Sequence, residues 1–152
     1  MYSKSRSAIA TGIIVSLLCS PAIAGGHNKV NPDAKYRHDV MEAMASHFAA
    51  LAAIFTGRVD RPGQLEAHAE ALAMTAAMTG SLFPAGSEGG AALPLAFEEP
   101  DGIAFGAEKI KTATAALAEA AASGDKGAIA KAFKTAGDGC KGCHDRYKAE
   151  DE

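Results

Sequence analysis

Tryptophan is absent from the 152-residue sequence, and aromatic residues make up only 6% of it. Stretches in which apolar and polar residues alternate, which would predict β-strands, are also missing. Alanine is abundant instead, together with leucine, glutamate and lysine, and these residue types favour helix. We therefore expect an all-α fold rather than one built on a sheet.

After its N-terminal segment the sequence has no apolar run long enough to cross a bilayer. The first residues include Lys4 and Arg6, an apolar stretch follows, and an Ala-Ile-Ala sequence ends at Ala24. A basic start, a short apolar core and a small-residue end are typical of a secretory signal peptide. We expect residues 1–24 to be this signal peptide, and residues 25–152 to form one periplasmic domain that does not insert into a membrane. An uncleaved N-terminal anchor is the alternative.

Cysteine is scarce, with three residues in the whole chain. Cys19 lies in the predicted signal peptide, and the residue before it, Leu18, is larger than a lipoprotein site would have. Cys19 is therefore expected to leave with the signal peptide. Cys140 and Cys143 are then the cysteines that the mature chain keeps.

An excess of positive charge is also lacking. The formal net charge is −3, and removal of Lys4 and Arg6 with the signal peptide takes it to −5. Binding to nucleic acid depends on basic residues that neutralise phosphates. Nucleic acid is therefore not an expected partner.

The sequence predicts four helices, at residues 32–56, 62–79, 102–122 and 125–149. Asn31 followed by Pro32 is typical of a helix start, and Gly57 of a helix end. Asp101 is the expected cap of the third helix, and Gly124 closes it.

Apolar residues recur in these segments at spacings of three and four, which keeps one face of each helix toward a core. The expected inward residues are Met41, Met44, Phe48, Leu51 and Phe55 in the first helix, Leu65, Leu72 and the region 74–78 in the second, Ile110 and Leu117 in the third, and Ile129, Phe133, Ala136, Cys140, Cys143 and Tyr147 in the fourth. One long connection, at residues 80–100, lies between two short ones. This pattern predicts an antiparallel four-helix bundle.

Residues 140–144 read Cys-Lys-Gly-Cys-His, which matches the C-x-x-C-H sequence of c-type haem attachment. Residues three apart lie on the same face of a helix, so both thiols can reach the two vinyl groups on one edge of a porphyrin. The histidine that follows then supplies a ligand to the iron. We expect one haem c, bound covalently to the C-terminal helix through Cys140 and Cys143, with His144 as the proximal iron ligand.

Other interpretations of the two cysteines have less support. A thioredoxin-like redox pair needs a βαβ context, which is not expected here. A zinc site needs two further ligands at a suitable spacing. A disulfide across three residues of a helix is sterically awkward. The remaining histidines, His27, His38, His47 and His68, are expected to face solvent rather than to bind iron.

Further short motifs precede the haem motif in a fixed order. They are residues 36–41 (Tyr-Arg-His-Asp-Val-Met), 44–48 (Met-Ala-Ser-His-Phe), 82–84 (Leu-Phe-Pro) and 86–90 (Gly-Ser-Glu-Gly-Gly). With residues 140–145 and Tyr147, the chain resembles the cytochrome c′ / cytochrome c-556 family, the class II c-type cytochromes. Members of that family carry the haem motif on the last helix of a four-helix bundle.

The resemblance implies roles for further residues. Arg37 matches an arginine that lies near a haem propionate, and Lys148 matches a basic residue close to the haem. Met41 matches the distal residue, on the side of the iron opposite the histidine, with Met44 as a less favoured competitor. Phe97 lies where the family often has tryptophan.

Two functions follow from two states of Met41. If its thioether binds the iron, the protein is a low-spin His/Met electron carrier of the c-556 type, and this is the main expectation. If Met41 only packs in the core, the iron is five-coordinate and binds a small gas such as nitric oxide or carbon monoxide. A haem enzyme such as a peroxidase is least supported, because no distal acid–base pair is visible.

Partners follow from the same resemblance. Redox partner proteins, which the sequence does not identify, are expected for an electron carrier. Pairing of two copies through the first two helices is common in the family, so a homodimer is a further expectation.

Overall fold

The structure, a computed structural model, describes residues 31–150. The predicted signal peptide and His27 lie outside these residues. The long helices are α1 (Pro32–Phe55), α2 (Leu65–Ala76), α4 (Pro100–Ser123) and α5 (Lys126–Tyr147), and the short ones are η1 (Pro62–Gln64), η2 (Thr79–Ser81) and α3 (Leu95–Glu98). No strand occurs within the described residues.

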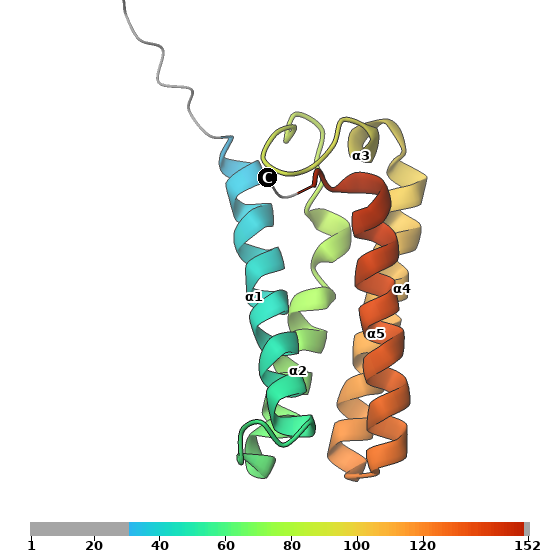
Figure 1. The fold of residues 1–152 in the computed structure, drawn as a ribbon. Coiled ribbons are helices and arrows are strands. Elements are labelled where there is room, and N and C mark those ends of the chain that lie inside the picture. Colours follow the sequence, from blue (N-terminus) through green and yellow to red (C-terminus); the bar gives the residue numbers. More distant parts are fainter. Residues whose placement is uncertain (1–30, 151–152) are drawn as a thin grey trace, which may run out of the picture.

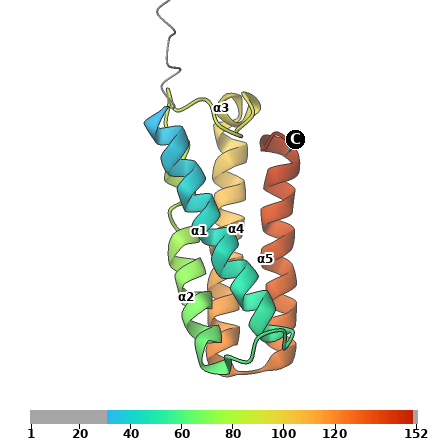
Figure 2. The same cartoon turned by 60° about the vertical axis from the view of Figure 1, so that its left-hand side comes forward.

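The four long helices lie side by side and alternate in direction along the chain (Figures 1 and 2). α1 packs against α2, α2 against α4, and α4 against α5. Short loops join α1 to η1 and α4 to α5, whereas a long connection joins α2 to α4. The prediction of an all-α, antiparallel four-helix bundle is confirmed.

The start of α1 and the end of α4 follow the predicted signals. The side-chain oxygen of Asn31 accepts hydrogen bonds from the backbone N–H groups of Asp33 at 3.0 Å and Ala34 at 3.4 Å, which caps α1. Asp125 caps α5 in the same way. Gly124, between α4 and α5, has a φ of 70°, a left-handed conformation that glycine adopts without strain.

The start of α4 differs from the prediction. The helix begins at Pro100, with Glu99 at the cap position, so Asp101 lies in the first turn and is not the cap. Proline is favoured at the first helical position because its missing N–H would have no partner there. The second predicted helix is also shorter than expected, since α2 ends at Ala76 and gives way to the turn η2.

The long connection crosses one end of the bundle and contains the short helix α3 (Figure 1). It is tied to the end of α5 by backbone pairing. An isolated β-bridge joins Ala92 to Lys148, and the N–H of Leu93 donates to the carbonyl oxygen of Tyr147 at 2.9 Å. The connection and the C-terminal end of α5 therefore form one unit.

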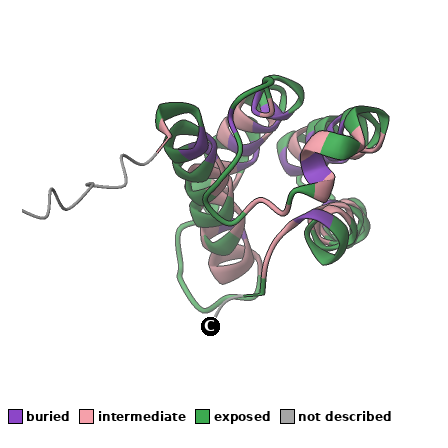
Figure 3. Cartoon of the chain, turned by 90° about the horizontal axis from the view of Figure 1, so that it is seen from above, coloured by how far each residue is buried: buried purple, intermediate pink, exposed green. Residues whose placement is uncertain are grey.

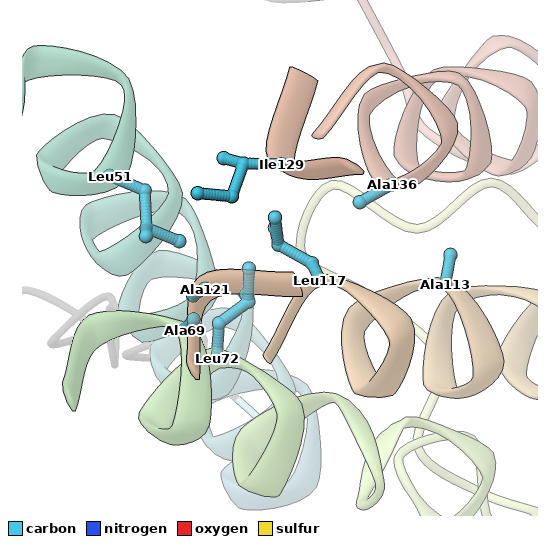
Figure 4. Packing of buried hydrophobic residues seen from close by; sticks show 8 residues of the cluster. All are labelled: Leu51, Ala69, Leu72, Ala113, Leu117, Ala121, Ile129 and Ala136. Atoms are coloured by element: carbon cyan, nitrogen blue, oxygen red, sulfur yellow. The ribbon is translucent and has the colours of Figure 1, made fainter. Parts of the chain in front are cut away.

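Buried apolar side chains fill the bundle toward its other end. Seen from above, the buried residues lie on the inner faces of the helices (Figure 3). Each long helix contributes to the main cluster, which is shown in Figure 4 and consists of Leu51, Ala69, Leu72, Ala113, Leu117, Ala121, Ile129 and Ala136. Alternation of leucine or isoleucine with alanine lets the helices approach closely while their side chains interlock.

The predicted inward positions are confirmed for three helices but not for the end of α2. Met74 is 71% exposed and Met78 is 41% exposed. The buried stripe of α2 runs through Ala69, Leu72 and Ala76, at spacings of three and four. Met74 lies two positions from Leu72 and so points about 200° around the helix from it, away from the core.

Candidate functional site

A cavity of about 360 Å³ lies between the helices at the end nearer the long connection. Its lining comes from α1, α2, α4, α5 and the connection. The five predicted site residues all line it: Arg37, Met41, Cys140, Cys143 and His144. The structure therefore brings together residues that are about a hundred positions apart in the sequence.

The α5 side of the cavity carries the two cysteines. Cys140 and Cys143 are half-buried, lie one turn apart on the same face, and form no disulfide. Burial raises the pKa of both thiols, so both stay protonated at neutral pH. A pair of thiols beside one cavity is the arrangement that addition to the two vinyl groups of a porphyrin requires.

Two glycines keep space free beside the thiols. Gly106 on α4 faces Cys143, and a Cβ atom at Gly106 would stand 3.4 Å from the Cys143 Sγ. A Cβ atom at Gly139 would stand 3.6 Å from Ile110 Cδ1. Both glycines line the cavity, so larger residues would occupy space beside the thiols. A flat apolar group fits in the space that these glycines leave beside the two thiols.

The middle of the α1 wall is apolar, whereas Arg37 and His38 line the cavity nearer the start of the helix and Glu42 lines it beside Met41. Met41, Met44 and Phe48 form the apolar part, and the Phe48 ring stacks on Phe133 of α5 with centroids 4.1 Å apart. The sulfur of Met44 accepts a hydrogen bond from the Thr79 hydroxyl at 3.9 Å. Since that bond engages Met44, Met41 is the better candidate for a thioether ligand on this wall.

Arg37 is a buried cation, only 5% exposed, and its guanidinium binds the long connection. Its Nη1 donates to the Leu82 carbonyl and to the Ser87 hydroxyl, both at 3.1 Å. Its Nη2 donates to the carbonyls of Ser87 at 3.0 Å and Gly89 at 2.8 Å. Arg37 thus holds the connection against α1, a role that the sequence did not indicate.

Two aromatic rings enclose the same guanidinium, with the Phe83 centroid at 5.0 Å and the Phe97 centroid at 5.3 Å from its carbon. Burial lowers the pKa of Arg37, yet a guanidinium remains charged throughout the physiological range. The four bonds to the connection engage both terminal nitrogens. A fork to a haem propionate would have to replace some of these bonds, and that contact remains a prediction.

A polar cluster fixes the end of α5 next to the haem motif. The buried Tyr147 donates its hydroxyl to Glu99 Oε2 at 2.8 Å, and Arg146 donates to both oxygens of Glu99 at 2.9 and 2.7 Å. The hydrogen bonds from Arg146 and then from Tyr147 lower the pKa of Glu99. Gly102 leaves room for the Tyr147 hydroxyl, since a Cβ atom there would overlap it. Sequence reasoning missed Glu99, because nothing local links it to a residue 48 positions away.

Three histidines outside the motif can be placed. His38 is exposed, as predicted, although it also lines the cavity. His47 and His68 are half-buried against one another, with their Nδ1 atoms 3.0 Å apart. The prediction that these two face solvent is therefore wrong. Because α1 packs against α2, both rings lie in the seam between these two helices.

A second cavity, of about 540 Å³, lies beyond Phe83, which lines both cavities. No histidine or cysteine lines it, so it carries none of the haem chemistry. Within residues 31–150, no group of three or more His, Cys, Asp or Glu could hold a metal ion. The same part of the chain has no helix that is long and apolar enough to cross a membrane.

Comparison with known proteins gives a consistent result. A family model described as Cytochrome C′ matches residues 33–148. The chain is 33% identical to the cytochrome c′ of Pararhodospirillum photometricum over 117 residues, which cover 75% of this chain and 94% of that relative. It is 30% identical to the cytochrome c′ of Alcaligenes xylosoxydans xylosoxydans over 115 residues, covering 75% of this chain and 91% of the relative.

Solved structures agree with the sequence relatives. A ferrous variant of cytochrome c prime from Alcaligenes xylosoxidans with bound NO matches with a TM-score of 0.72 and 30% identity, covering 78% of this chain and 94% of that chain. A carbon monoxide-bound variant from the same organism matches with a TM-score of 0.74 and 29% identity, covering 81% of this chain and 98% of that chain.

Proposed function

The chain belongs to the cytochrome c′ family, and from this premise we propose that it binds a small gas, nitric oxide or carbon monoxide, at its haem. Its cofactor is one covalent haem c, as in the rest of the family. We assign the thioether bonds to Cys140 and Cys143 and the proximal ligand to His144. The haem iron supplies the position at which a diatomic gas binds.

The observation that carries the proposal is a cavity with thiols and an imidazole on one side and apolar side chains on the other. Met41 and Phe48 face the α5 motif across this space. The part of the wall formed by these two side chains offers no hydrogen bonds to water, so it favours a small uncharged ligand over a polar one. The matching Alcaligenes structures with bound NO and carbon monoxide support the same assignment.

The second candidate is the His/Met electron carrier, which the sequence favoured. Met41 lies on the cavity wall and is half-buried, so a thioether is available on the side opposite α5. Against this, the curated relatives that match are named cytochrome c′, and five of the matching structures carry nitric oxide or carbon monoxide. We therefore rank gas binding first.

An absorption spectrum of the haem-loaded protein separates the two candidates. Gas binding predicts high-spin bands in the wild type and a changed spectrum when carbon monoxide is added to the ferrous form. It also predicts little change in the resting spectrum of Met41→Leu. Met44→Leu, on the same wall, is the matched control. Low-spin bands that become high-spin in Met41→Leu, but not in Met44→Leu, would establish the His/Met carrier and refute our proposal.

Attachment is tested separately by intact mass. We expect the exported wild type to carry the mass of haem through denaturation, and the double variant of Cys140→Ala and Cys143→Ala to lose it. Retention of haem mass by the double variant would contradict the assignment of the thioether bonds.

We also propose export to the periplasm with removal of residues 1–24, so that the mature N-terminus is Gly25. N-terminal sequencing of the exported protein checks this. We further propose that the protein makes transient contacts with redox partner proteins and that two copies pair through α1 and α2. Sedimentation of the haem-loaded protein tests the pairing.

A further inference from the structure

The seam between α1 and α2 holds two histidines that the haem site does not use. His47 of α1 and His68 of α2 place their Nδ1 atoms 3.0 Å apart. Their ring centroids are 5.3 Å apart and the rings are tilted by 52°, so they converge through their nitrogens and do not stack. Both residues are half-buried, which leaves solvent access to the pair.

This spacing suits a metal ion as well as a hydrogen bond. Two imidazole nitrogens bound to one Zn²⁺ at about 2.0–2.1 Å, in neighbouring coordination positions, stand roughly 2.9–3.4 Å apart. The observed 3.0 Å lies in that range. The two helices can therefore keep their spacing, but each ring has to turn about its Cβ–Cγ bond, because the centroid distance of 5.3 Å shows that the two nitrogens now point straight at one another.

The packing around the pair fixes the spacing of the two helices that carry it. Leu51 lies one turn after His47 on α1, and Leu72 lies one turn after His68 on α2. Both leucines are fully buried in the main cluster, which fixes the two helices relative to one another. Preorganised ligands lose little conformational entropy when they bind an ion.

The rest of the coordination sphere would be water. No third His, Cys, Asp or Glu joins the pair within residues 31–150. A site with two imidazoles and open positions binds ions of the Zn²⁺, Ni²⁺ and Cu²⁺ class, which imidazole suits, and releases them more easily than a closed four-ligand site.

We propose that His47 and His68 form a binding site for a divalent transition-metal ion, with Zn²⁺ as the probe, that clamps α1 to α2. The ion replaces the hydrogen bond between the two rings and binds the Nδ1 atom of each, and the ring that donated the hydrogen bond then carries its proton on Nε2. The site is separate from the haem, whose cavity neither histidine lines. Its test is therefore independent of gas binding.

Calorimetric titration of the haem-loaded mature protein with Zn²⁺ tests the proposal. We expect one ion per chain, and affinity that falls on the order of a hundredfold in either His47→Gln or His68→Gln, because one imidazole then binds without the help of the other. Glutamine can still hydrogen-bond the remaining ring, so the seam stays closed. Far-UV circular dichroism and the haem spectrum check that each variant is folded.

All proteins in the test carry His27→Gln, because the mature chain would otherwise begin Gly-Gly-His, whose terminal amine and imidazole bind divalent ions themselves. His38→Gln is the matched control, since it removes a histidine outside the pair, and it should bind Zn²⁺ as the protein with the intact pair does. Zn²⁺ should also raise the melting temperature of the protein with the intact pair and of the control, but not of the pair variants. Absence of binding to the protein with the intact pair up to about 1 mM Zn²⁺, or equal binding by the pair variants, would overturn the proposal.

Discussion

Replacement of Arg37 tests how the long connection is held over the cavity. Arg37→Met keeps an unbranched apolar stem between the rings of Phe83 and Phe97 but removes the guanidinium. The carbonyls of Leu82 and Ser87 and the Ser87 hydroxyl, whose bonds to Arg37 are buried, then lose their donors. The fourth bond, to the carbonyl oxygen of Gly89, is only partly buried.

The magnitude follows from these bonds. A buried acceptor that loses its donor costs about 1–3 kcal/mol, and three are affected here. Part of this loss is recovered, because residues 84–86 and 88–91 are exposed and can turn toward water, and because the guanidinium no longer has to be desolvated. We therefore expect Arg37→Met to lower the free energy of unfolding by about 3 kcal/mol.

Arg37→Lys separates charge from geometry. An ammonium keeps the charge but carries its donors on one nitrogen, so it cannot reach all the acceptors that the guanidinium spans. We expect a loss of about 2 kcal/mol for this variant. Lys35→Met is the matched control, because Lys35 is an exposed cation on the same helix, paired with Asp39, and should contribute less than about 1 kcal/mol.

Urea unfolding of the haem-loaded protein, followed by far-UV circular dichroism, measures these differences. The slope of the transition should stay the same while its midpoint falls. An Arg37→Met variant within about 1 kcal/mol of the wild type, or an Arg37→Lys variant equal to it, would refute the idea that this network anchors the connection.

Two further predictions concern the cluster at the end of α5. Gly102→Ala should destabilise the protein by about 1–3 kcal/mol in urea unfolding, because the added Cβ atom overlaps the Tyr147 hydroxyl. Adding Tyr147→Phe removes that hydroxyl and should recover part of the loss. If the losses of the two variants simply add, the overlap is not the cause. Hydrogen bonds from Arg146 and Tyr147 lower the pKa of Glu99 in the folded protein below its ordinary value of 4.5. The ionised carboxylate therefore stabilises the fold at pH values above 4.5, and this contribution is lost as the pH falls through the pKa of the folded state. The melting temperature of the wild type should therefore fall more between pH 5 and pH 3 than that of Glu99→Gln, and parallel curves would contradict this linkage.

The sequence predicted the parts of the fold that depend on local signals. Asn31, Asp125 and Gly124 act through neighbouring backbone groups, so the ends of α1, α4 and α5 could be read from a few residues. The haem motif is local as well, since the spacing of Cys140 and Cys143 places both on one face of a helix. These features required no knowledge of how the helices pack.

Features that depend on packing between distant segments were not predictable in the same way. Met74 was expected in the core because methionine is apolar, but its direction depends on which face of α2 meets α4. The pairing of His47 with His68 depends on the register of α1 against α2. The anchoring of the connection by Arg37 joins residues about 50 positions apart, and no sequence spacing encodes it.

The apolar cluster around Leu51 and Leu117 includes none of the residues of the C-x-x-C-H motif. This end of the bundle is thus held together by a cluster separate from the smaller one around Ile103 and Tyr147 beside the haem motif. The contacts that join the helices at this end are therefore made without any residue that attaches the haem. The two cysteines that would carry the haem line the cavity at the opposite end, so attachment and helix packing depend on different parts of the bundle.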